Sequence, residues 1–267
     1  MFISMSRTDL PKDFLSTLVP ELDGSDILGI VLGGSHARGD AGLYSDVDVA
    51  LFVKDDVQPP PKQFFYRDGY LVSIAFKNVA GIREEISRPN RAIFVVPGLR
   101  GATILLDKNG SVGNLLRDID AFVWEPLQPA ADSYASYTVM ALAEQVHKVL
   151  TETPRGNELA LAYATAKLLP GLTEAVAVQR GVLVKSDNTY YEQVEAVAGP
   201  EWAKDHRIVA GVDAEVGDAT PATSRALAAV RLYRETVEFL RSSMEPAHLA
   251  IAERAVKIAE SEVNLGL

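Results

Sequence analysis

Hydrophobic residues in the first half of the chain occur in short runs bounded by turn-forming residues. Ile27–Leu32 and Asp46–Val53 are rich in β-branched residues, and Gly33-Gly34 follows the first of them. Runs of this length and composition are typical of buried strands. Tyr70–Phe76, which follows Asp68-Gly69, predicts a third strand for the same reason. The pattern therefore predicts a sheet in this half of the chain.

Other segments of the first half show helical spacing or turn composition. Helices are predicted at Asp9–Leu22, Val79–Arg88 and Ser111–Phe122, the second ended by Pro89. Lys54–Lys62 contains a run of prolines and predicts an extended loop. Two further apolar runs, separated by Pro97-Gly98, are Ala92–Val96 and Ala102–Leu106.

The pattern changes near Glu125–Pro129, after which the chain is rich in alanine and has long helical periods. The predicted helices are Tyr134–Leu150, Leu159–Arg180, Tyr190–Ala198, Ser224–Ser242 and Pro246–Val263. The fold class expected is α+β. A mixed β-sheet with flanking helices, residues 1–127, should be followed by a helical bundle domain, residues 128–267.

The candidate chemistry lies between the first two strands. Asp46 and Asp48 are two residues apart, so in a strand they point to the same face. Adjacent carboxylates repel each other unless a cation lies between them, and hard oxygen ligands favour Mg²⁺. Gly33-Gly34 lets the backbone approach a ligand closely, and a helix starting at Ser35 would direct free N–H groups at a phosphate. Such a combination is typical of phosphoryl or nucleotidyl transfer.

The stretch GGSHARGDAGLYSDVDVALF, residues 33–52, resembles the signature of the nucleotidyltransferase superfamily related to DNA polymerase β. It is most similar to the branch that contains the aminoglycoside and lincosamide nucleotidyltransferases. This resemblance implies Mg²⁺-dependent transfer of a nucleoside monophosphate from an NTP to a hydroxyl of a small acceptor, with release of pyrophosphate. It makes an antibiotic a natural candidate acceptor, and it implies an active site in the cleft between the two domains.

The resemblance also implies residue roles. Asp46 and Asp48 would be catalytic and would bind the metal. The nucleotide-binding residues would be Gly33, Gly34, Ser35, Arg38, Ser45 and Lys167, and the catalytic base would be Glu174. For Ser45, shaping the loop or capping the entry to the second strand is favoured over a chemical role. Lys167 and Glu174 are seven residues apart on one face of an otherwise apolar helix, where an ordinary ion pair is the alternative explanation.

The chain departs from the family pattern at one position. A third carboxylate is normally found on the next strand, where this chain has Ser73. A serine hydroxyl is a poor metal ligand and cannot serve as a general base. Either the alignment differs here, or a second metal is weakly held, or the base lies elsewhere. A protein that binds nucleotide without turnover is the alternative function.

Composition and charge restrict the classes of molecule that the protein is expected to bind. The chain has 267 residues, a net charge of −10 and no cysteine. The charge disfavours nucleic acid as a partner, although not a protein acceptor. No apolar run reaches the roughly 18 residues of a membrane span, and the first residues lack a signal-peptide core. We therefore expect a cytoplasmic monomer or homodimer that binds an NTP and a small molecule.

Overall fold

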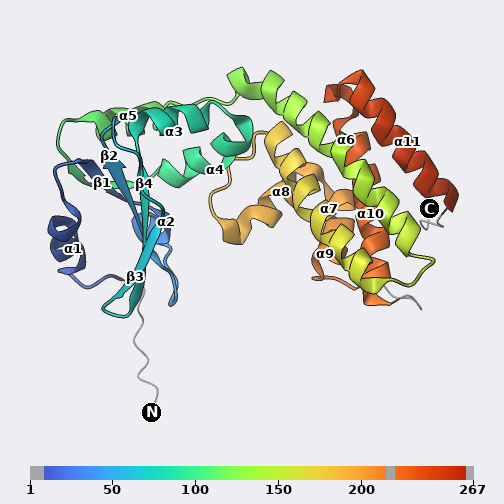
Figure 1. Ribbon diagram of the computed structural model, residues 1–267, viewed down its shortest axis with the longest axis horizontal. Helices are drawn as coiled ribbons and strands as arrows, with labels where there is room; N and C mark the ends of the chain where they lie inside the picture. The colour runs from blue at the N-terminus through green and yellow to red at the C-terminus, as the bar shows by residue number, and fades with distance from the viewer. Residues whose placement is uncertain (1–8, 215–219, 263–267) are drawn as a thin grey trace, which may run out of the picture. The chain divides into compact units, whose positions relative to one another are not determined.

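The computed structural model describes residues 9–214 and 220–262 (Figure 1). It divides into two compact units, Met1–Val123 and Trp124–Leu267. The prediction that residues 1–127 and 128–267 act as separate functional domains stays a prediction. The first eight residues, which entered the argument about a signal peptide, lie outside the described residues, as does Val263 at the end of the last predicted helix.

The first unit is built on a mixed five-stranded sheet with the strand order β3-β4-β2-β1-β5. The β2–β4 pair is parallel, and the other neighbouring strands are antiparallel. The strands are β1 (Ile27–Leu32), β2 (Val47–Val53), β3 (Gln63–Arg67), β4 (Tyr70–Lys77) and β5 (Thr103–Asp107). The three strands predicted from the pattern are present, and the α+β fold class is confirmed.

Strand β3 was not predicted, because Asp68-Gly69 was treated only as a boundary of the strand that follows it. Both residues have positive φ angles, 51° and 81°, which a tight two-residue hairpin turn requires. Arg67 therefore pairs with Tyr70, and β3 extends the sheet as an edge strand. The site described below depends on this added edge.

Over the part of the first unit that the structure describes, five helices accompany the sheet. They are α1 (Phe14–Leu22), α2 (Gly34–Arg38), α3 (Val79–Ile86), α4 (Pro89–Leu99) and α5 (Ser111–Asp120). Helix α1 begins later than predicted, because Pro11-Lys12-Asp13 forms a turn ahead of it. The apolar run Ala92–Val96 belongs to α4, in which Pro89 occupies the first turn, where a missing N–H costs nothing. Figure 1 shows α1 on one side of the sheet and α3 and α4 on the other.

Successive side chains of β2 alternate between the hydrophobic core on one face of the sheet and Asp48 on the other face. Val47, Val49 and Leu51 are buried in a hydrophobic cluster that includes Phe14 of α1. Because successive side chains of a strand point to opposite faces, Asp48 points to the other face of the sheet. Packing of α1 therefore determines which face carries the carboxylate.

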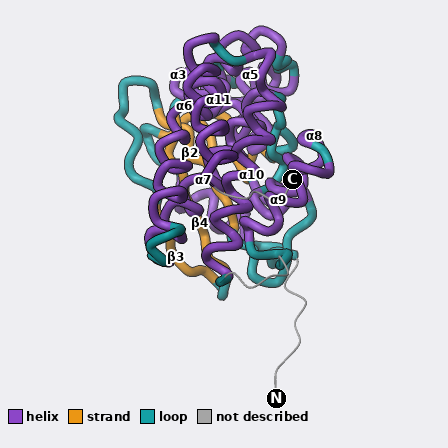
Figure 2. The backbone as a smooth tube through the Cα atoms, turned by 90° about the vertical axis from the view of Figure 1, so that its right-hand side faces the viewer, coloured by secondary structure: helices purple, strands orange, loops and turns teal. Residues whose placement is uncertain are grey.

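The second unit is helical (Figure 2). Its helices are α6 (Gln128–Glu152), α7 (Glu158–Gln179), α8 (Tyr190–Ala198), α9 (Pro200–Ala210), α10 (Pro221–Leu240) and α11 (Pro246–Glu262). Short 3₁₀ segments lie at Glu125–Leu127, Asp187–Thr189 and Arg241–Ser243. Helix α9 was not predicted, although Gly199-Pro200 is a typical helix start. Over the described residues, no helix combines the length and the apolar character that a membrane crossing demands.

Candidate functional site

The candidate site is built around Asp48, the second residue of β2. In the parallel β2–β4 pair Asp48 lies directly opposite Ser73, and Asp46 immediately precedes the strand. Both carboxylates are half-buried. Burial raises the pKa of Asp48, and the negative charge of Asp46 adds to this rise; the shared metal-binding role of the two acids stays a prediction.

The turn from β1 into α2 lies against the Asp48 carboxylate. Gly33 N donates a hydrogen bond of 2.9 Å to the Asp48 carbonyl oxygen. Gly34 has a φ of +61°, and a methyl group there would lie 3.2 Å from both Cβ and Cγ of Asp48, and closer still to Oδ2. A side chain at this position would displace the carboxylate. The glycine pair was expected to let the backbone come close to a ligand. In the structure, it lets the backbone come close to the carboxylate of Asp48.

A hollow of about 260 Å³ opens on the Asp48 face of the sheet. Its lining includes Gly33, Gly34, Arg38, Asp48 and Ser73. Alanines of β2 and β4 and a glycine of α4 complete this part of the wall, and small side chains of this kind leave space beside the carboxylate. The structure thus brings the glycine turn, one cation and one carboxylate of the predicted set to a single hollow.

The electrostatics of this hollow favour a bound cation. Burial raises the pKa of Asp48 above its ordinary value of 3.8, and the negative charge of Asp46 raises it further. The Ser73 hydroxyl and the cations Lys62 and Arg38 oppose this rise in the pKa. A divalent ion would relieve the repulsion and accept the hard oxygen ligands, so the residues present fit Mg²⁺.

Ser73 faces the carboxylates, as predicted, instead of the hydrophobic core. Its side chain is 1% exposed, and its Oγ makes no hydrogen bond of normal geometry within the described structure. The hydroxyl nevertheless lies close enough to Asp48 to favour the ionised carboxylate. The described residues contain no group of three or more His, Cys, Asp or Glu side chains arranged to hold a metal. Asp48 is the carboxylate that lines this hollow, and Asp46 lies two residues before it in the chain.

The remaining residues of the predicted phosphate loop have differing environments. Arg38 lines the hollow, although its Nε also lies 3.2 Å from Oδ2 of Asp40. Ser35 is in the first turn of α2, and its carbonyl accepts a hydrogen bond from Gly39 N. Ser45 Oγ accepts a 2.8 Å hydrogen bond from Gly42 N, so this side chain shapes the loop. A direct role of Ser35 or Ser45 in nucleotide binding stays a prediction.

Lys167 and Glu174 lie on α7 in the second unit. Lys167 is exposed, with its Nζ 5.7 Å from the centroid of the Tyr163 ring, so it is not part of a buried ion pair, and the alternative of an ion pair at an interface is not tested. Glu174 is half-buried and accepts a 2.8 Å hydrogen bond from the Tyr134 hydroxyl. This hydrogen bond gives Glu174 a structural partner within its own unit. The catalytic roles of both residues stay predictions.

Lys62 is a cation whose charge acts on Asp48 and which the sequence pattern did not single out. It precedes β3, and its positive charge lowers the pKa of Asp48. Its Nζ lies 4.9 Å from the centroid of the Phe64 ring. The signal was available in the Lys62-to-Tyr66 segment next to Asp68-Gly69, which is a hairpin pattern.

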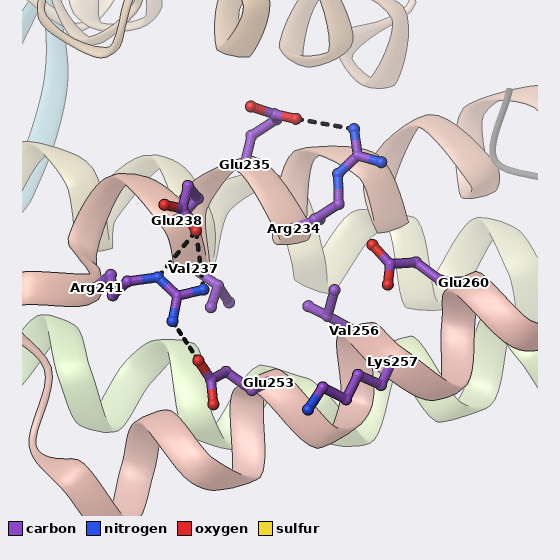
Figure 3. A pocket seen from close by; sticks show the side chains of 9 residues that line it. All are labelled: Arg234, Glu235, Val237, Glu238, Arg241, Glu253, Val256, Lys257 and Glu260. Carbon is purple, nitrogen blue, oxygen red and sulfur yellow. Dashed lines mark hydrogen bonds and ion pairs between the residues drawn. The ribbon is translucent and has the colours of Figure 1, made fainter. Parts of the chain in front are cut away.

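A second hollow, of about 290 Å³, lies between α10 and α11 of the second unit (Figure 3). Charged side chains line it, and several pair with one another. Arg241 bonds to Glu238 and Glu253, and Arg234 bonds to Glu235. These pairs satisfy most of the polar groups that the hollow offers, so we place the candidate chemistry at the Asp48 hollow, despite its smaller volume.

The sequence comparison agrees with this placement. Residues 12–95 match the family model described as the nucleotidyltransferase domain. The matched range contains the glycine turn, both carboxylates, β3 and Ser73. Residues 12–95 are therefore similar to nucleotidyltransferase domains. This similarity agrees with the broad family that the motif indicated, and nothing in the match singles out the aminoglycoside and lincosamide branch.

A similar solved structure is the crystal structure of a nucleotidyltransferase-like protein from Exiguobacterium sibiricum 255-15. It is 14% identical in sequence, with a TM-score of 0.48, and the match covers 95% of this chain and 79% of that chain. The search among curated proteins gave no match to this chain.

Proposed function

We propose that the protein transfers a nucleoside monophosphate from an NTP to a hydroxyl group of a small acceptor, with release of pyrophosphate. The observation that carries the proposal is the half-buried carboxylate pair beside a glycine turn within a nucleotidyltransferase domain. Nucleotidyltransferase domains generally use divalent metals. Asp46 and Asp48 would hold Mg²⁺, which supplies charge neutralisation at the triphosphate when it is bound.

The chain's own groups would act mainly by positioning and by electrostatics. Gly33 and Gly34 admit the phosphates to the hollow without steric obstruction, and Arg38 adds positive charge at its rim. The acceptor hydroxyl attacks the α-phosphate, the bond to pyrophosphate breaks, and the hydroxyl proton passes to a base. Ser73 cannot accept that proton, and Glu174 stays the candidate base that the family resemblance implies, a role that the variant described in the Discussion tests.

The proposal is tested with purified protein, each labelled NTP, Mg²⁺, and a panel of aminoglycosides, lincosamides and cell metabolites. We expect labelled product and pyrophosphate. Asp46→Asn and Asp48→Asn should each lower nucleotide binding or turnover at least tenfold, about 1.4 kcal/mol, while the protein remains folded. Unchanged turnover in both variants would contradict the assignment of the carboxylates.

The alternative function is a regulatory protein that binds nucleotide without turnover, which the serine at position 73 favours. It predicts that the unaltered protein binds an NTP with Mg²⁺ but releases no pyrophosphate with any acceptor. The intact carboxylate pair and glycine turn favour transfer.

A further inference from the structure

We propose that Phe64 and Tyr66 of β3 form the surface that binds the acceptor, and that they select a hydroxylated compound with an uncharged ring. The inference rests on the proposed function and goes beyond it in assigning a site and a class of acceptor. It concerns only residues of the first unit.

The register of the sheet places Phe64 in line with the carboxylate. Phe64 lies directly opposite Ser73, and Ser73 lies directly opposite Asp48. Directly opposite residues of paired strands project from the same face, so the three side chains form one row across β3, β4 and β2. Tyr66 lies opposite Leu71, two residues from Ser73, and therefore projects from this face as well.

Both aromatic rings are exposed, although they stand on a face that elsewhere is covered. Phe64 is 58% exposed and Tyr66 is 77% exposed. Phe65, between them, points to the opposite face and packs against the hydrophobic cluster. One exposed aromatic residue would be unremarkable, but two neighbouring rings on the site face of an edge strand form an apolar patch of the kind that binds ligands.

In-line attack determines which substrate reaches this patch. The attacking oxygen must approach the α-phosphate from the side opposite to the leaving pyrophosphate. Gly34 and Arg38, the groups suited to the outer phosphates, lie on the α2 side of Asp48. Strands β4 and β3 lie on the other side of β2 from β1 and the glycine turn that follows it. Helix α2 meets β4 at the first residue of that strand, where the His36 and Tyr70 ring centroids are 6.0 Å apart. The acceptor should therefore lie over Ser73 and reach Phe64 and Tyr66.

The chemistry of the patch restricts the acceptor. Exposed aromatic faces bind flat or ring-shaped apolar surfaces by stacking, which an open chain covers poorly. Lys62 already places its ammonium group over the Phe64 ring, at 4.9 Å from the centroid. A cationic acceptor would be repelled there, whereas an uncharged ring with hydroxyl groups can stack and accept a hydrogen bond from Lys62. Small residues beside Ser73 leave the path to the carboxylates open.

The experiment compares the unaltered protein with Phe64→Ala, Tyr66→Ala and the control Gln63→Ala. Gln63 is exposed on the same strand but pairs with Ile74, a residue of the core face. Acceptors would be methyl glucoside and myo-inositol as uncharged rings, kanamycin as a cationic ring compound, and sorbitol as an open chain. Calorimetry in the presence of Mg²⁺ would measure the affinity of each protein for ATP, GTP, CTP or UTP. The same measurement would be made with inorganic tripolyphosphate in place of the nucleotide.

We expect transfer to an uncharged ring, with KM for that acceptor raised about tenfold in Phe64→Ala and Tyr66→Ala. Their affinity for the nucleotide should stay within about twofold of that of the unaltered protein. The control Gln63→Ala should keep both its acceptor KM and its nucleotide affinity within the same limit. Weaker nucleotide binding with unchanged tripolyphosphate binding would show that the patch holds the nucleoside, which overturns the assignment to the acceptor.

Other outcomes separate this inference from the proposed function. Transfer to sorbitol or kanamycin in preference to the uncharged rings would overturn the inference while leaving the proposed function in place. Unchanged acceptor KM in both aromatic variants would do the same. No transfer to these or any other acceptor, with nucleotide still bound, would overturn both.

Discussion

Replacing Gly34 with alanine tests the link between the glycine turn and the carboxylate. Gly34 has a φ of +61°, a region in which residues with a Cβ lose about 1–2 kcal/mol. The new methyl group would also lie 3.2 Å from Cβ and Cγ of Asp48, tighter than ordinary van der Waals contact. The side chain of Asp48 must therefore rotate away from its present position.

Gly39 provides the matched control. It follows the same short helix, has a φ of +78°, and an added Cβ there would have no atom within 4 Å. Gly39→Ala should thus show the backbone penalty alone, about 1–2 kcal/mol, and retain its affinity for nucleotide. Gly34→Ala should show a similar or larger loss of stability and, in addition, at least a tenfold loss of affinity for Mg²⁺–NTP, about 1.4 kcal/mol.

Thermal unfolding followed by circular dichroism would measure stability, and calorimetry would measure Mg²⁺–NTP affinity. For a protein of this size, 1 kcal/mol corresponds to a change in Tm of about 2–4 °C. If Gly34→Ala binds Mg²⁺–NTP as tightly as Gly39→Ala does, the close approach of the turn to Asp48 has no role in binding, and the reasoning is refuted.

Three further predictions concern the acids and their neighbours. Because the pKa of Asp48 is higher in the folded protein than its ordinary value of 3.8, the folded state binds this proton more tightly than the unfolded state does. The contribution of Asp48 to the free energy of unfolding of the unaltered protein therefore falls as the pH rises above 3.8. Asp48→Asn should therefore be more stable than the unaltered protein at pH 7 without metal, and the difference should vanish in acid; a difference that grows in acid would contradict the assigned cause. Ser73→Asp should tighten binding of a second Mn²⁺ measured by electron paramagnetic resonance, and unchanged stoichiometry and affinity would show that position 73 is not a ligand position. Glu174→Gln should lower kcat by about 10²–10⁴ with little change in NTP affinity, whereas Tyr134→Phe, which removes the hydroxyl that donates to Glu174 and leaves the carboxylate in place, should lower it less; normal turnover of Glu174→Gln would exclude it as the base.

The local pattern of the sequence predicted the strands and the glycine turn at the centre of the candidate site. Two short apolar runs and a glycine turn predict strands and a close backbone approach, because these features depend on steric properties of a few adjacent residues. The spacing of Asp46 and Asp48 also predicts a shared face, since side-chain alternation is a property of any strand. The family model matched over residues 12–95 agrees with that local signal.

Elements whose conformation depends on partners were harder to predict. The apolar run Ala92–Val96 is a segment of α4, and short apolar runs alone do not distinguish a buried helix from a strand. Strand β3 exists because it pairs with β4 through a hairpin turn, and its own alternation is weak.

The chemistry of the site depends on the tertiary structure. Sequence alone predicted that Asp46 and Asp48 share a face, but the direction of that face was decided by the packing of α1 against the alternate residues of β2. The pairing of β2 with β4 placed Ser73 beside Asp48, and the pairing of β4 with β3 placed Phe64 in the same row. Such neighbours come from hydrogen bonds between segments distant in the sequence, which no local pattern specifies.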